Sequence, residues 1–312
     1  MNLSAVVAKY VAYKRSVGMR FNTEAATLKS FCRTLGEVPM TKVRADRVLA
    51  YLAGSGPVTR FWQRKYEVLC GFYRFAIARG YATCSPLPPR APKPAQAFVP
   101  YIYSREELQR LLEAASAANH PRARIDPYVL RTLLLLLYGA GLRISEALSL
   151  TMADLNLEQA LVHVRESKFY KTRLVPLGAD LTCALRQYAG KRSHDYSCKP
   201  EAPLFPFRDA TPLSRDAAET AFRRVRAAAG VLRSDGARYQ PRLHDLRHSA
   251  AVHRLIAWYR SGANVQQLLP VLATYLGHAN IAATQRYLTL TPELLHEASL
   301  RFARYAMEAT DE

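Results

Sequence analysis

Hydrophobic residues recur every three to four positions in four stretches of the first 80 residues. This period predicts helices over roughly residues 3–17, 23–35, 43–53 and 57–80, with turn signals between them. In the last helix the spacing predicts a core that is made by Phe61, Leu69, Phe72, Tyr73 and Ile77. We therefore expect a small helical domain over residues 1–84.

A proline-rich segment follows, SPLPPRAPKPAQAFVP, residues 85–100. Its six prolines fix backbone angles and remove amide donors that a helix needs, which is typical of a semi-rigid linker. The segment thus separates the helical domain from a second domain over residues 101–312.

The second domain opens with a capping-box pattern, because Ser104 stands three residues before Glu107. Helical periods follow at about 125–138, 144–150, 214–229, 244–260 and 280–305. Between them, residues 154–178 (DLNLEQALVHVRESKFYKTRLVPLG) are enriched in Val and Leu with a shorter period, which predicts two or three antiparallel strands. The fold class is therefore mainly α with a small antiparallel β-sheet.

Charge indicates the kind of partner. The 44 Lys and Arg residues outnumber the 25 Asp and Glu residues, which gives a net charge of +19 and a pI near 10.0. Residues 1–100 hold 16 basic and 4 acidic side chains and carry +12 of this excess. Such an excess favours a polyanion, and double-stranded DNA is the partner we expect. Arg60, Arg64 and Lys65 are predicted phosphate contacts, although a merely solvated helix face is the alternative for each.

Cysteine usage and hydropathy favour a cytoplasmic protein. No CxxC pair occurs, and an odd number of scattered thiols is typical of a reducing compartment. No signal peptide is evident, and the most apolar stretch, residues 132–142, is too short to span a bilayer, so we expect no membrane association. We interpret all five cysteines as structural or incidental: Cys32, Cys70, Cys84, Cys183 and Cys198.

Polar residues concentrate in four otherwise apolar stretches of the second domain: GAGLRISEALSL, SKFYKTRLVPLG, RLHDLRHSAAVH and LGHANIAATQRY. Arg143 follows two glycines at the start of a helix, and His244 and Arg247 are spaced to share one helical face. Two guanidinium groups that face each other suit a tetrahedral anion such as phosphate. Taken alone, Arg143 has a simpler interpretation, a pair with Glu146 one turn later.

These residues together resemble the tyrosine recombinase family, which includes phage integrases and the Xer and Cre recombinases. The resemblance spans residues 100–305, and the basic helical domain resembles the family's core-binding, SAM-like domain. It implies a two-domain DNA clamp. The positions that match the family's catalytic residues are Arg143 in GLRISEAL, Lys168 in the β-hairpin, His244 and Arg247 in HDLRHS, His278 in LGH and Tyr287 in TQRY.

The resemblance implies DNA cleavage and rejoining through a 3′-phosphotyrosine at Tyr287. His244 would act as general base and Lys168 as the acid that protonates the 5′ oxygen, while Arg143, Arg247 and His278 would bind the non-bridging phosphate oxygens. No ATP, metal or other cofactor is expected. His278 and Tyr287 are nine residues apart on what the pattern predicts to be one helix.

The hairpin leaves an alternative open. It reads Ser-Lys-Phe-Tyr-Lys without the family's small glycine-containing turn, so Lys171 competes with Lys168 as the acid. Lys171 and Arg173 are also predicted DNA contacts. His244 and His248 have the i, i+4 spacing of a zinc pair, but the surrounding sequence lacks the rest of such a motif, and we expect no metal.

The segment PELLHEASLRFARYAM, residues 292–307, is amphipathic. We expect it to pack into a neighbouring protomer of a homotetramer on paired DNA sites, with docking on its own domain as the alternative. Activities compatible with the same residues are type IB topoisomerase-like relaxation and a catalytically silent DNA-binding role. Phage, Xer and transposon subfamilies all stay open, as do the target sequence and the choice among integration, excision and resolution.

Overall fold

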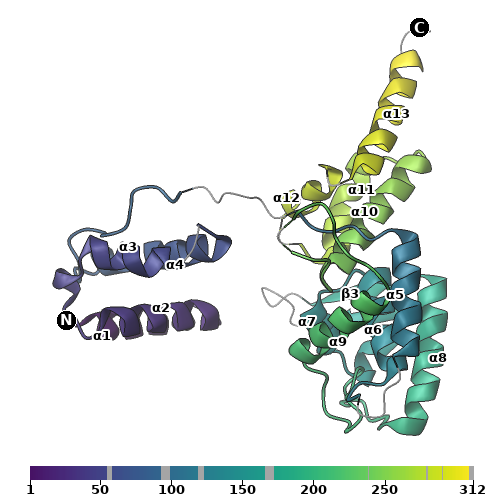
Figure 1. The fold of residues 1–312 in the computed structure, drawn as a ribbon, viewed down its shortest axis with the longest axis horizontal. Coiled ribbons are helices and arrows are strands. Elements are labelled where there is room, and N and C mark those ends of the chain that lie inside the picture. Colours follow the sequence, from purple (N-terminus) through teal and green to yellow (C-terminus); the bar gives the residue numbers. More distant parts are fainter. Residues whose placement is uncertain are drawn as a thin grey trace. The chain divides into compact units, whose positions relative to one another are not determined.

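The computed structural model describes residues 1–54, 58–92, 99–118, 123–165, 172–237, 239–278, 280–289 and 291–308, with side chains of the last helix as far as Ala303. The chain divides into two compact units, Met1–Phe98 and Val99–Glu312 (Figure 1). This division falls within the segment predicted as the linker. Each unit is described by itself below.

The first unit is helical. Its described elements are α1 (Leu3–Ser16), α2 (Asn22–Leu35), η1 (Met40–Lys42), α3 (Ala45–Ala53) and α4 (Arg60–Ala78). Tyr10 of α1 lies edge-on to Phe21, with ring centroids 5.4 Å apart, and also packs on Phe75 of α4. A Cβ added to Gly71 would lie 2.7 Å from the Tyr10 hydroxyl, so α1 and α4 approach closely because this position carries no side chain.

Two residues of the core predicted for this unit lie outside it. Phe61 is 63% exposed and Ile77 is 40% exposed, so their prediction as core residues was wrong. Trp62 and Ala76, their immediate neighbours in α4, are buried instead. Trp62 follows Phe61 whereas Ala76 precedes Ile77, so the two exposed residues flank the buried face on opposite sides, and Trp62 and Ala76 fill that face at its two ends instead.

The second unit opens with α5 (Arg105–Ala117), and the predicted capping box is confirmed. The Glu107 amide donates to Ser104 Oγ at 3.2 Å, and the Ser104 amide donates to Glu107 Oε2 at 2.9 Å. The elements that follow up to the sheet are α6 (Pro127–Gly139), α7 (Ile144–Leu148) and η2 (Met152–Asp154). After the sheet come α8 (Ala179–Asp195), α9 (Arg215–Ala228), α10 (Asp245–Arg260) and α11 (Val265–Leu276).

The predicted antiparallel sheet is confirmed. It consists of β1 (Leu155–Asn156), β2 (Leu161–Val164) and β3 (Arg173–Pro176) in the order β1-β2-β3. Val162 pairs with Val175, and both side chains are fully buried. Lys168 and Lys171 belong to the connection between β2 and β3 and lie outside the described residues.

The C-terminal segment is not the single helix that its sequence predicted. Its described elements are α12 (Ala282–Gln285), η3 (Arg286–Thr289) and α13 (Pro292–Glu308). His278 comes after Gly277, a left-handed residue (φ 65°) that ends α11, while Tyr287 lies in η3. The prediction of His278 and Tyr287 on one helix was wrong, because Gly277 stops α11 just before His278 and the next described helix, α12, begins only at Ala282. Pro292 then opens α13, where its missing amide costs nothing.

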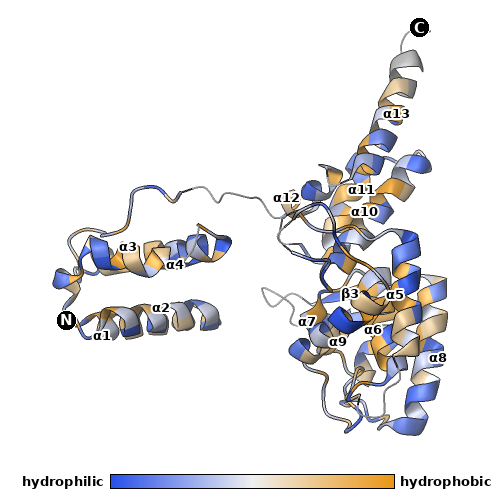
Figure 2. Ribbon diagram, viewed as in Figure 1, coloured by the Kyte–Doolittle hydropathy of each residue, from blue (hydrophilic) through white to orange (hydrophobic). Residues whose placement is uncertain are grey.

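Two apolar clusters support this unit. The larger one is centred on the leucine-rich α6 and includes the buried valines of β2 and β3. The smaller one is built by α10, α11 and the start of α13, and it contains Tyr287 and Leu294. The helices carry hydrophobic and hydrophilic residues side by side, α13 included (Figure 2). Every helix in the described part of the chain falls short of the length and apolar character that a membrane span requires.

Candidate active site

Arg143 links the start of α7 to the turn that follows α11. Its Nη1 donates to Glu146 Oε1 at 2.6 Å, and its Nη2 donates to the Gly277 carbonyl at 2.7 Å. The pair with Glu146, which the sequence suggested as a simple explanation for Arg143, therefore exists. It does not use up this arginine, because the guanidinium has five N–H donors and the side chain keeps 21% exposure.

Glu146 also binds a second arginine. Arg173, the first residue of β3, donates from Nη1 and Nη2 to the two carboxylate oxygens at 3.1 and 2.9 Å. Burial alone would raise the pKa of Glu146, but the Arg173 hydrogen bonds, the Arg143 amide and the two guanidinium charges outweigh it and bring that pKa down to about 2. The carboxylate thus stays ionised and holds both arginines at neutral pH.

Arg247 on α10 joins the two glycine turns of the site. It is 2% exposed, and its Nη1 donates to the Gly141 carbonyl at 2.5 Å while its Nη2 donates to the Leu276 carbonyl. Gly141 has φ 59°, and a Cβ there would lie 2.9 Å from the Leu276 side chain. Gly277 likewise has φ 65°, and a Cβ there would meet the Arg173 guanidinium at 2.8 Å. Glycine is therefore required at both positions, for backbone conformation and for space.

His278 is oriented by the threonine of the TQRY sequence. Its Nδ1 lies 2.7 Å from Thr284 Oγ1, and Thr284 is fully buried. The His278 ring lies nearly parallel to the Tyr287 ring, with centroids 6.0 Å apart. The Gly277 turn and the Thr284 contact thus bring His278 beside the predicted nucleophile, although the two residues are on different elements.

Tyr287 is 4% exposed, and its hydroxyl lies 3.1 Å from Nδ1 of His248. Arg247 is close enough to act on the pKa of the phenol. His244 contacts His248 edge-on, with ring centroids 4.8 Å apart. The predicted residues Arg143, His244, Arg247, His278 and Tyr287 therefore lie together.

The imidazoles of the site are neutral in the DNA-free protein. Burial lowers the pKa of His244, His248 and His278 to about 4, and the Arg247 charge acts in the same direction on each. Burial raises the pKa of Tyr287 above its ordinary value, while Arg247 and Arg143 oppose this rise. At neutral pH the site therefore combines cationic guanidinium groups with neutral imidazoles and a protonated phenol, which suits an incoming anion.

The start of α10 is held in place from two sides. Asp245, 1% exposed, accepts from the Arg242 amide at 2.8 Å and from Arg242 Nη2 at 2.9 Å. The Tyr103 amide donates to Ser249 Oγ at 2.8 Å, and the Tyr103 hydroxyl donates to the Arg242 carbonyl at 2.9 Å. The HDLRHS segment is thus anchored by its neighbour Arg242 and by Tyr103, which is far from it in the sequence.

The predicted DNA contacts have different surroundings. Arg60 is exposed at the start of α4, and Arg64 lies 3.5 Å from Glu24. Lys65 donates to the Tyr51 carbonyl at 2.9 Å and lies over the rings of Tyr51 and Phe61. Arg173 is partly buried, with a side-chain exposure of 10%. Lys65 and Arg173 thus have intramolecular partners, which the sequence pattern did not indicate.

Three residues in the site were not predicted to have a role there. His248 was noted only for its spacing from His244, yet it is the group that contacts the Tyr287 hydroxyl. Glu146 was considered for Arg143 alone, and Thr284 only as part of TQRY. The i, i+3 and i, i+4 spacings were available as signals, but which partner each side chain meets depends on contacts between distant elements. Within the described residues, no group of His, Cys, Asp and Glu side chains gathers that could hold a metal ion.

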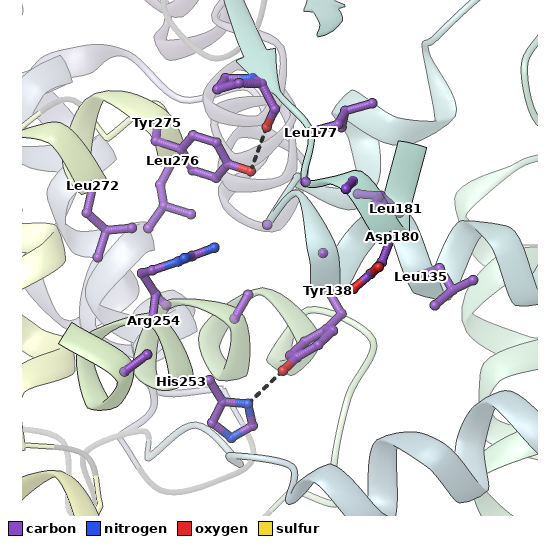
Figure 3. A pocket seen from close by; sticks show the side chains of 18 of the residues that line it. Leu135, Tyr138, Leu177, Asp180, Leu181, His253, Arg254, Leu272, Tyr275 and Leu276 are labelled. Carbon is purple, nitrogen blue, oxygen red and sulfur yellow. Dashed lines mark hydrogen bonds between the residues drawn. The ribbon is translucent and has the colours of Figure 1, made fainter. Parts of the chain in front are cut away.

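A separate apolar cavity of about 740 Å³ lies between α6, α8, α10 and α11. Figure 3 shows Tyr138 and His253 at one side of it, joined by a hydrogen bond of 2.9 Å, and Tyr275 at the other, where its hydroxyl donates to the Pro176 carbonyl. None of the predicted catalytic residues that the structure describes lines it. The cavity is therefore distinct from the cluster around Tyr287.

Comparisons with known proteins identify the family and the fold of the chain. Residues 103–293 match the model of the phage integrase family. The chain is 33% identical over 305 residues to the integrase/recombinase y4rB of Sinorhizobium fredii, covering 96% of each chain.

Among solved structures, it shares the fold of the Tn1549 transposon integrase in complex with a circular intermediate DNA, with a TM-score of 0.71, 16% identity and 97% and 99% of the two chains covered. It also shares the fold of a lambda integrase tetramer bound to a Holliday junction, with a TM-score of 0.60, 18% identity and 80% and 72% covered.

The chain belongs to the phage integrase family, that of the tyrosine recombinases. It is a site-specific DNA recombinase of the tyrosine type.

Proposed function

We propose that the recombinase cuts and rejoins DNA with Tyr287 as its nucleophile. The observation that carries this assignment is the convergence of the Tyr287 hydroxyl, Arg247, His278 and Arg143 around the Gly277 turn. Attack of the phenol oxygen on phosphorus forms a 3′-phosphotyrosine and releases a 5′ oxygen. The energy of the phosphate ester is kept in the covalent bond, so a 5′-hydroxyl from another strand reverses the step without ATP or a metal.

The charges of the site match the needs of this reaction. As charge develops on the non-bridging oxygens, Arg143 and Arg247 offer guanidinium donors and His278 an imidazole N–H. The contacts of both arginines with backbone carbonyls hold them in place before DNA arrives, so little reorganisation is needed. His244 is assigned as the general base, since an entering phosphate anion raises the pKa of nearby imidazoles from the low value of the DNA-free protein.

Lys168 is assigned as the acid that protonates the leaving 5′ oxygen, with Lys171 as the alternative. Support comes from the described end of the hairpin, because Arg173 at the start of β3 is bound to Glu146 beside Arg143. That contact holds Arg173, two residues after Lys171 and five after Lys168 in the sequence, beside Arg143. Separate Lys168→Ala and Lys171→Ala variants distinguish the two, because only loss of the acid is rescued by a substrate with a good leaving group at the 5′ position.

The assignment is tested with a nicked suicide substrate, which loses the 5′-hydroxyl fragment after cleavage and traps the covalent complex. The expected result is a protein–DNA adduct whose attached peptide maps to Tyr287, formed in the presence of a chelator and without ATP. Sequencing the trapped DNA identifies the target. Relaxation of supercoiled DNA without strand exchange between two sites would instead favour topoisomerase-like activity.

Duplex DNA is the proposed partner of both units, which would form a clamp. The basic excess of the first 100 residues and the likeness in fold to an integrase solved with DNA support this. The site of action is accordingly proposed to be the cytoplasm, as the cysteine usage of the chain suggested. Affinity should come mostly from phosphate contacts and fall steeply with salt.

Arg60→Ala is expected to weaken DNA binding without changing the fold, because Arg60 is exposed. Loss of one phosphate contact should lower the slope of log affinity against log salt by about 1. Fluorescence anisotropy between 50 and 200 mM salt, roughly the range over which such contacts dominate, measures this slope. Arg33→Ala, an exposed arginine on α2, is the charge-matched control. Equal slopes for Arg60→Ala and the unmodified protein would exclude the contact.

The proposed assembly is a homotetramer on two DNA sites, as in the lambda integrase tetramer with which the chain shares its fold. The first half of α13 packs on its own unit, since Leu294 is fully buried and Arg260 binds Glu293 and Glu297 at 2.7 Å each. Further along, Leu300 is 41% and Phe302 72% exposed. We therefore propose that the outer part of α13 is the segment offered to a neighbouring protomer.

The double substitution Leu300→Asp and Phe302→Asp is expected to reduce tetramer formation on DNA at least about tenfold, because a charged group cannot be buried unpaired in an apolar interface. Monomer binding to one site should persist, since Leu294 still anchors the helix. Sedimentation of complexes with paired sites measures both. Leu232→Asp, at a residue 63% exposed elsewhere in the unit, is the control. Unchanged tetramers in the double variant would refute the exchange.

A further inference from the structure

His248 makes a contact that none of the proposed catalytic roles explains. Its Nδ1 is 3.1 Å from the hydroxyl of Tyr287, and the two ring centroids are 5.6 Å apart. The described hydrogen bonds of the Tyr287 hydroxyl include no other imidazole. His244, to which the base role is assigned, meets the edge of the His248 ring.

The direction of this hydrogen bond follows from the protonation states. The pKa of Tyr287 is raised by burial, so its oxygen carries a proton at neutral pH. The pKa of His248 is lowered to about 4 by burial and by Arg247, Arg242, Arg286 and His278, so its ring is neutral. The phenol therefore donates and Nδ1 accepts, which leaves the ring proton on Nε2.

In the DNA-free protein, transfer of the Tyr287 proton to His248 is unfavourable. Burial and the surrounding arginines keep the pKa of His248 at about 4, whereas burial raises the pKa of the phenol. The pKa of His244 is lowered to the same value, so the pH profiles of the variants described below decide which imidazole takes the proton after the phosphate enters. Before DNA binds, the contact can therefore act as a hydrogen bond that orients the hydroxyl.

The His248 ring is itself held firmly. It projects from α10, whose first turn is anchored by the Arg242–Asp245 pair and by Ser249, and its ring packs against His244 on one side and Tyr287 on the other. Tyr287, by contrast, is on the short 3₁₀ turn η3. A rigid helix thus directs an acceptor at the hydroxyl of a residue on a less regular element.

We propose that His248 is a positioning residue that fixes the Tyr287 hydroxyl beside Arg247 and His278 in the DNA-free protein. This inference rests on the proposed role of Tyr287 as nucleophile. The nucleophile is then oriented before the phosphate enters, so the activation free energy of cleavage contains a smaller cost for ordering the tyrosine. A displacement of about 1 Å in such a group costs on the order of 100-fold in rate.

The test compares three substitutions of His248 by single-turnover cleavage of the suicide substrate at saturating protein. His248→Ala removes the acceptor and is expected to slow cleavage by about 10- to 100-fold. His248→Asn places an amide oxygen where Nδ1 stood and is expected to restore the rate to within about threefold of the unmodified protein. His248→Gln carries its amide one carbon further, at the place of Nε2, and is expected to stay as slow as His248→Ala.

His253 supplies a matched control. It is on the same helix, and its Nδ1 lies 2.9 Å from the hydroxyl of Tyr138 in the apolar cavity, a similar pair without the nucleophile. His253→Ala is expected to change the cleavage rate by less than about twofold. DNA affinity should be equal in all variants, and the pH profile of His248→Asn should match that of the unmodified protein, because positioning requires no titration of residue 248.

Each other outcome overturns the proposal. Faster cleavage by His248→Ala would mean that the contact restrains the tyrosine in an inactive position. Equal loss in the Ala and Asn variants, with a changed pH profile, would mean that His248 takes the proton. Unchanged cleavage would mean that the contact has no role. If Tyr287→Phe still forms the adduct, the nucleophile assignment itself fails, a result separate from any effect of residue 248.

Discussion

Replacing Tyr287 by phenylalanine is expected to abolish the covalent DNA adduct and recombination, while the protein stays folded and binds DNA. The substitution removes only the attacking oxygen and leaves a ring of the same shape in the small core. Loss of a nucleophile lowers the rate by at least about 10⁴-fold in enzymes that depend on a covalent intermediate. The lost hydrogen bond with His248 costs about 1 kcal/mol of stability.

Denaturing gels of the suicide-substrate reaction measure the adduct, and gel shifts measure binding. Tyr275→Phe is the matched control. Tyr275 stands two residues before Gly277, and its hydroxyl donates to the Pro176 carbonyl at 3.3 Å rather than to a group of the site. That variant should form the adduct at nearly the normal rate. An adduct that persists in Tyr287→Phe would mean that another residue attacks the phosphate.

The second large effect is expected for Glu146→Gln, which keeps the shape of the side chain and removes its charge. Glu146 has a side-chain exposure of 3% and binds both Arg143 and Arg173. Breaking a buried pair on one side leaves its partners unpaired, which costs about 3 to 5 kcal/mol of stability. Because Arg143 is positioned by this carboxylate, cleavage should also fall by on the order of 100-fold.

Urea unfolding measures the first effect, and single-turnover cleavage by the remaining folded protein measures the second. Glu219→Gln is the control, since its ion pair with Arg215 is exposed and is worth at most about 1 kcal/mol. A Glu146→Gln protein with normal stability and normal cleavage would show that the two arginines need no anchor.

The contribution of Glu146 to stability is also expected to depend on pH. Folding lowers its pKa from the ordinary value of 4.5 to about 2, which corresponds to about 3 kcal/mol. For a lowered carboxyl pKa, the stabilisation is complete above the unfolded value and is lost as the pH falls through the folded one. The stability difference between the unmodified protein and Glu146→Gln should therefore shrink by about two-thirds between pH 7 and pH 3.

Local features of the sequence were sufficient for most of the secondary structure. The capping box at Ser104, the strands around Val162 and Val175 and the main helices depend on hydrogen bonds and side-chain periods within a few residues. The resemblance to the family depends on short motifs, GLRISEAL, HDLRHS and LGH, which are visible in the sequence alone. None of these features requires knowledge of how distant elements pack.

The sequence by itself thus determined the fold class and the basic character of the chain, and it predicted five residues that the structure brings together: Arg143, His244, Arg247, His278 and Tyr287. Only the tertiary structure decided which side chains meet. Glu146 binds Arg173 as well as Arg143, Lys65 donates to the Tyr51 carbonyl, and His248 contacts the Tyr287 hydroxyl. The physical reason is range. Helical and strand periods are set by neighbours within about four residues, whereas these contacts join elements up to 39 positions apart and depend on glycine turns whose geometry appears only when the chain is folded.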